Sequence, residues 1–272
     1  MDDDAVQVFR AWVGALAADD PRARRFGARH HRHRLAPPLG EARVAALEAA
    51  LGLRLPDDYR GFVGRVADGG AGPYHGLLPL DHPVQRRCAA GSFRFTAPAD
   101  DARGEDVHAG VLGLGHVGCG QVALLVVRGE AAGEVWLDAR EADAGIGPIA
   151  PSFTAYLEEW VERTARGELP RALVPAGRCA LPAALSSYLA RCEDVRGLAR
   201  GTLGGDALRG ALQALGPGAI AVVATRDGPF FAPDDPLDPC PACALLIENL
   251  RARGLAADAV APGLPPVPAR RP

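Results

Sequence analysis

The sequence contains no lysine, so all 30 of its basic residues are arginine. Together with many alanine, glycine and proline residues, this bias is typical of a GC-rich bacterial genome and indicates no function. No apolar run approaches the roughly 20 residues that a membrane-spanning helix needs. The acidic start Met1–Asp4 also lacks the basic-then-apolar order of a signal peptide. We therefore expect a cytoplasmic protein that does not insert into a membrane.

The chain also lacks a strong charge of either sign. Its net charge of −3 provides no general attraction to nucleic acid, so no direct nucleic-acid partner is expected. A length of 272 residues with 48% hydrophobic residues suits one large or two ordinary globular domains. The six cysteines would stay reduced in the cytoplasm, which favours metal binding or no role over disulfides. Cys88 and Cys119 have no partner at ligand spacing and are interpreted as core thiols.

The first 35 residues are predicted to form a helix followed by a basic linker. The helix spans about residues 2–18, and its apolar side chains share one face: Val6, Phe9, Val13 and Leu16. Residues 21–34 are rich in arginine and contain His30, His31 and His33, whose spacing does not place them on one helical face. We interpret this run as a solvated linker.

Residues 36–166 have the pattern of an α+β domain. One helix is predicted to end at Gly52, and a second begins at Pro56. Short apolar runs separated by glycines predict strands at 111–114, 122–127 and 134–137. A last helix covers 153–161 with a clean apolar stripe. Helices beside a mostly antiparallel sheet define the α+β class.

Several motifs of this segment, over residues 41–160, resemble the SUKH superfamily, the fold of many bacterial toxin-immunity proteins and of a fungal cell-wall regulator. They are the run 51–62 (LGLRLPDDYRGF), the glycine-rich run 69–80, Gly118-Cys119-Gly120, Trp136 in its strand and the helix with Phe153 and Trp160. The resemblance implies a protein that binds and blocks a secreted toxin, often a nuclease. Two acidic stretches are candidate toxin contacts: Asp100-Asp101 with Glu105-Asp106, and Glu158-Glu159.

A second domain is predicted at residues 173–261, after a boundary at 166–175 that contains Gly167, Pro170 and Pro175. Its pattern is helix, helix, strand at 219–225, and helix from Cys240 to about 252. The proline-rich tail at 262–272 is expected to be disordered. Cys179 stands at one helix start, and Cys240 and Cys243 open another. Two cysteines three residues apart at a helix start can chelate one ion.

Residues 178–251 resemble the bacterial deaminase group related to YwqJ, which implies a smaller α/β deaminase-like domain. The resemblance rests on the segment 178–186 (RCALPAALS), the apolar run 218–223 and the Pro-Cys-Pro-Ala-Cys at 239–243. It implies zinc held by Cys179, Cys240 and Cys243, with water in a fourth position. Such enzymes need a glutamate two residues after the first ligand, where this chain has Leu181. The implied domain is therefore a degenerate deaminase.

Other interpretations of these cysteines remain open. In a second register Cys192 is the ligand and Asp194, or Glu193, moves the protons. The Cys-Pro-Ala-Cys is also compatible with a redox pair, or with buried thiols that hold no metal. The resulting hypothesis is a bacterial immunity protein that neutralises a cognate toxin, a nuclease or a deaminase, by direct binding. The alternatives are a zinc-dependent deaminase of nucleotides or nucleic acids, and a regulatory scaffold of the fungal kind.

Overall fold

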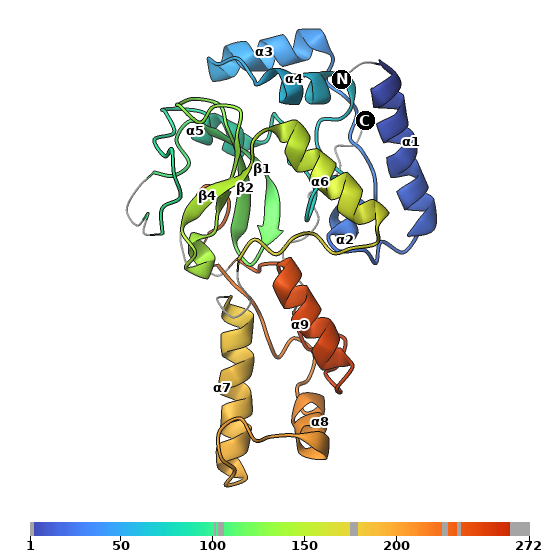
Figure 1. Ribbon diagram of the computed structural model, residues 1–272, viewed down its shortest axis with the longest axis vertical. Helices are drawn as coiled ribbons and strands as arrows, with labels where there is room; N and C mark the ends of the chain where they lie inside the picture. Colours follow the sequence, from blue (N-terminus) through green and yellow to red (C-terminus); the bar gives the residue numbers. More distant parts are fainter. Residues whose placement is uncertain are drawn as a thin grey trace.

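The structure, a computed structural model, describes residues 3–100, 102, 106–174, 179–224, 228–232 and 235–261. Figure 1 shows a body built around one sheet, from which three C-terminal helices project together. The predicted tail at 262–272 lies outside the described residues. None of the described helices combines the length and the apolar character that a membrane crossing requires.

The sheet is an antiparallel meander of four strands in sequential order. Its strands are β1 (Val111–Gly118), β2 (Gln121–Val126), β3 (Val135–Asp138) and β4 (Ile146–Ala150). Every residue of β2 and β3 is buried, because helices and loops cover both faces of the sheet. The first three strands were predicted, whereas β4 was not. Its Gly147 and Pro148 hide the strand pattern, and an edge strand tolerates proline.

Three helices pack their aromatic side chains together beside the sheet. They are α1 (Asp3–Asp19), α4 (Asp57–Arg65) and α6 (Phe153–Ala165). The ring of Phe153 lies 5.0 Å from that of Tyr59 and 5.1 Å from that of Phe62. Trp12 of α1 meets Trp160 of α6 edge to face at 5.1 Å. Such pairs add about 0.5–1.5 kcal/mol to the free energy of area burial, so α1 is an integral part of this body.

The edge of β1 that faces away from β2 is covered by α5 (Pro83–Cys88) and by the loop that contains Leu78. The buried side-chain amide of Gln85 accepts a hydrogen bond from the Gly113 amide and donates one to the Gly113 carbonyl, both at 2.9 Å. Leu78 N donates to Leu114 O at 2.7 Å. These bonds satisfy backbone groups that an edge strand would otherwise present to other chains.

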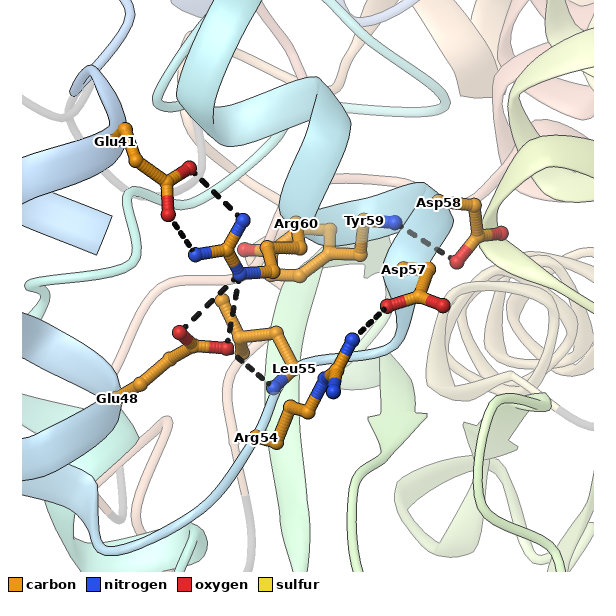
Figure 2. Close-up of polar contacts among 8 residues, drawn as sticks. All are labelled: Glu41, Glu48, Arg54, Leu55, Asp57, Asp58, Tyr59 and Arg60. Carbon is orange, nitrogen blue, oxygen red and sulfur yellow. Dashed lines mark hydrogen bonds and ion pairs between the residues drawn. The ribbon is translucent and has the colours of Figure 1, made fainter. Parts of the chain in front are cut away.

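A carboxylate clamp joins α3 (Glu41–Leu51) to the start of α4, as Figure 2 shows. Arg60 pairs with Glu41 on one side and with Glu48 on the other, at 3.2 Å. Glu48 Oε1 also accepts the Leu55 amide at 2.9 Å. Gly52 ends α3 in the left-handed conformation that was predicted, with φ 64°. The clamp therefore fixes the connection between the two helices.

We expect Glu48→Ala to lower the free energy of unfolding by about 1–3 kcal/mol, because it leaves the Leu55 amide without its charged acceptor. Urea unfolding of the purified variant measures this loss. Glu41→Ala is the matched control, since the Glu41 side chain is 74% exposed and bonds only to Arg60 among the described hydrogen bonds. Equal losses in the two variants would contradict the role given to Glu48.

The basic segment at 21–34 is not the solvated linker that the sequence predicted. Most of its arginines are exposed, but it contains the short helix α2 (Ala28–His31), and the side chain of His33 is buried. His33 Nε2 lies 3.0 Å from Asp20 Oδ2, which also accepts the Arg25 amide, while Asp20 Oδ1 accepts the Arg24 amide. The histidines pack inward because they are less costly to bury than arginine.

The C-terminal part contains three helices: α7 (Ala180–Val195), α8 (Gly205–Gln213) and α9 (Pro241–Arg251). All three were predicted. The strand predicted at 219–225 is absent from the described part of that range, which has isolated bridges from Ile220 to Val260 and from Val223 to Pro236. Ile220, Val222 and Ala224 are nevertheless buried, so the apolar run supplies core without forming a sheet. The domain division at 166–173 stays a prediction.

Candidate metal centre

Four cysteines converge where the C-terminal part meets the tip of the β1–β2 hairpin. The sulfur atoms of Cys119, Cys179, Cys240 and Cys243 all lie within 4.8 Å of one another, and each residue is at most 4% exposed. Cys119 Sγ is 3.6 Å from Cys243 Sγ, and Cys179 Sγ is 3.6 Å from Cys240 Sγ. Both distances far exceed the S–S bond of about 2.05 Å in a disulfide, so these are free thiols placed to share a ligand.

Cys179, Cys240 and Cys243 reach the centre from two helix starts. Cys179 is the N-cap residue of α7, and Cys240 is the N-cap residue of α9, where Pro241 occupies the first helical position. Cys243 follows within the first turn of α9. The positive end of each helix dipole favours a thiolate at these positions. The structure therefore brings together the three cysteines that the sequence pattern had singled out.

Cys119, which the sequence analysis had interpreted as a core thiol, is the fourth member of the cluster. It forms the tip of the hairpin with Gly120, because Gly118 pairs with Gln121 across a two-residue turn. Its amide donates to Asp238 O at 2.6 Å, and its sulfur accepts the Cys240 amide at 3.3 Å. The available signal was a cysteine between two glycines, an unusual place for a core thiol. Sequence spacing alone could not show that residues 119 and 240 are neighbours.

The four thiols interact closely with one another. The pKa of Cys240 lies well below its usual value, because the thiol of Cys119 and then those of Cys179 and Cys243 hydrogen-bond to its thiolate. The pKa of Cys119 is raised, first because of its hydrogen bond with Cys179. A thiolate held among three further sulfurs is the donor set that Zn²⁺ binds in structural sites.

A group of polar contacts beside the cysteine cluster holds the segment that leads into α9. The buried Asp238 carboxylate contacts the Arg29 guanidinium and lies 2.8 Å from His30 Nε2. A ring nitrogen of His75 lies 3.2 Å from the Pro239 carbonyl oxygen. Burial lowers the pKa of His75 to about 3 and that of His30 to about 4. His30, His75 and Asp238 could also surround a cation, but Arg29 already neutralises the carboxylate.

The alternative ligand Cys192 is not part of the centre. It follows Cys179 by 13 residues on the same helix, which at 1.5 Å per residue separates them by roughly 20 Å. Asp194 is exposed and pairs with Arg200 at 2.8 Å. Glu193 accepts the amides of Gly201 and Leu203, at 3.0 and 2.9 Å, and so organises the loop after α7. None of the three reaches the cysteine cluster.

Two further features bear on deaminase chemistry. Leu181, at the position of the expected glutamate, is fully buried in the apolar core. A deaminase keeps one zinc position open for water, whereas here a fourth sulfur, that of Cys119, lies within 4.8 Å of the other three. Cys88 is buried in the main core outside the cluster, in agreement with its interpretation as a core thiol.

The acidic stretches are only partly available as toxin contacts. Asp100, Asp106 and Glu158 are exposed. Glu159 instead binds Arg171 at 3.0 Å, within the predicted domain boundary. Asp101 and Glu105 lie outside the described residues.

The fold and the site define a mixed α/β protein with a four-stranded antiparallel sheet and a cysteine cluster at its hairpin tip. Residues 38–159 match the model of the SMI1 / KNR4 family (SUKH-1). The matched segment contains α3, α4, α5, the whole sheet and the first part of α6, and its four-stranded antiparallel sheet is consistent with a SUKH-type domain. No curated protein and no solved structure was found to match the chain.

Proposed function

We propose that this protein is an immunity protein of a bacterial toxin system that neutralises a cognate toxin by direct binding in the cytoplasm. The observation that carries the proposal is the SUKH-1 match over residues 38–159, because that family is known for immunity proteins. The matched segment includes the entire sheet and the clamp between α3 and α4. A protein that acts by binding needs such a rigid body to hold one surface in shape.

Exposed acidic side chains on the SUKH-type domain indicate which class of toxin to test first. Asp106 and Glu158 are exposed on the SUKH-type domain, and a nuclease toxin carries a basic surface to hold its substrate. Opposite charges across an interface speed association and favour the correct partner. A basic nuclease is therefore the first class of toxin to test, and a deaminase toxin is the second.

The experiment is co-expression with each toxin domain encoded in the same genome. Growth rescue by one toxin–protein pair, together with a stable complex of the two purified chains, is the expected result. A toxin of the same class from a distant genome is the matched control and should remain lethal. If no toxin of the genome is bound or neutralised, the proposed function is wrong.

We also propose that the cysteine centre binds zinc, with Cys179, Cys240 and Cys243 among its ligands. Support comes from their burial and from sulfur distances that suit one ion. Metal analysis of freshly reduced protein should find about one zinc per chain. Protein that contains no zinc and takes up none would contradict this part of the proposal and leave toxin binding untouched. Deamination has less support, since Leu181 cannot move protons and Asp194 lies at the far end of α7.

A further inference from the structure

We propose that Cys119 completes a closed, four-thiolate zinc site, and that this zinc fastens the C-terminal part to the β1–β2 hairpin of the SUKH-type domain. The inference rests on zinc occupancy, as proposed above. It goes further by assigning the fourth ligand to a different part of the chain, and it makes the site structural. A catalytic zinc keeps a position for water, whereas a structural zinc has four protein ligands.

The sulfur geometry fits a tetrahedral site. With Zn–S bonds of about 2.3 Å, the sulfurs of a regular tetrahedron lie about 3.8 Å apart. The two sulfur pairs at 3.6 Å and the overall limit of 4.8 Å are close to that arrangement. Four sulfurs so near one another and shielded from water leave little room for a water ligand.

The backbone conformation of the hairpin tip costs free energy, and a role of Cys119 as a zinc ligand accounts for that cost. Cys119 and Gly120 have φ of 52° and 74°, the pattern of a type I′ turn. Such turns favour asparagine or aspartate followed by glycine, and a cysteine in the left-handed region costs about 1–2 kcal/mol. The cost is accounted for if this position must place a sulfur among Cys179, Cys240 and Cys243.

Neighbouring backbone groups can stabilise the negative charge of such a site. Four thiolates and Zn²⁺ carry a net charge of −2, which is expensive to bury without donors. The helix starts at Cys179 and Cys240 both direct positive dipole ends at the sulfurs. The Cys240 amide also donates to Cys119 Sγ at 3.3 Å.

The close approach of the two parts centres on this site. A Cβ on Gly118 would lie 2.5 Å from the Pro239 carbonyl oxygen, so only glycine allows the contact. The Cys119 amide bonds to Asp238 O. Zinc would thus link residue 119 to residues 179, 240 and 243 and hold the segment 238–243 on the hairpin. In this way the metal joins helices α7 and α9 to the body in Figure 1.

X-ray absorption at the zinc edge of the full-length holo-protein is the first test, since it needs no variant. We expect four sulfur neighbours at about 2.3 Å. Three sulfurs and one oxygen or nitrogen would overturn the inference and leave zinc binding intact. Protein that neither contains nor takes up zinc would overturn both, whereas failure to neutralise any toxin bears on neither.

Cys119→Asn is the second test, because asparagine suits the turn and the variant should fold. We expect zinc affinity, measured by chelator competition, to fall by at least about 100-fold, the upper end of the loss seen for outer-sphere partners. Hydrogen exchange should become faster at the amides of residues 119, 238, 240, 242 and 243. Cys192→Ser, which changes a cysteine outside the cluster, should leave both measurements unchanged. Unchanged affinity and exchange in Cys119→Asn would overturn the inference.

Discussion

Cys243→Ser is expected to purify almost without zinc and to lose at least about 4 kcal/mol of unfolding free energy in zinc-containing buffer. A ligand present at 1,000 times its dissociation constant contributes about that much to the folded state. Removal of one buried thiolate breaks the pair that Cys240 and Cys243 form on the first turn of α9. Metal analysis and urea unfolding, each with and without added zinc, measure the two effects.

The matched control is Cys192→Ser, which should keep about one zinc per chain because its sulfur is remote from the cluster. Wild-type protein treated with a strong chelator should resemble Cys243→Ser, and added zinc should restore only the wild type. A Cys243→Ser protein with full zinc content and unchanged stability would show that this cysteine is no ligand.

Leu181→Glu is expected to destabilise the protein by several kcal/mol and to produce no deaminase. The substitution places a glutamate where the deaminase resemblance expects one. However, Leu181 is 0% exposed, and a buried carboxylate without a partner costs several kcal/mol. In the zinc site proposed above, the fourth position around the metal would also remain filled by Cys119. Thermal unfolding and an ammonia-release assay with cytidine and adenosine check the two outcomes.

Leu181→Met is the control, since it preserves volume and apolar character and should cost less than about 1.5 kcal/mol. Ammonia release by Leu181→Glu, absent from the wild type and from Leu181→Met, would contradict the closed-site interpretation. It would show that water can reach the metal. A fully stable Leu181→Glu protein would contradict the burial argument instead.

The sequence itself predicted most helices, since their information is local. In α1 the spacing of Val6, Val13 and Leu16 specified the buried face, and the same residues are buried in the structure. Gly52 ended α3 as expected, because only glycine adopts that conformation without strain. The motif at 51–62 predicted the SUKH-type domain, and the family match at 38–159 supports it.

Where several parts of the chain meet, the local pattern was insufficient. The histidines near residue 30 look like part of a polar run, yet His30 packs beside Asp238 and His75, and His33 is buried against Asp20. The apolar run at 219–224 has the composition of a strand, but its residues form only isolated β-bridges and no continuous strand. Each outcome depends on neighbours that are distant in the sequence.

The cysteine cluster separates the two kinds of information most clearly. The sequence by itself determined that Cys240 and Cys243 share a helix start and that Cys179 stands at another, since these are properties of short segments. Only the tertiary structure decided that Cys119 joins them, because a two-residue turn brings it against residues 238–240. Sulfur atoms 60 or more residues apart become neighbours only when the C-terminal part packs against the hairpin, and no local pattern encodes that contact.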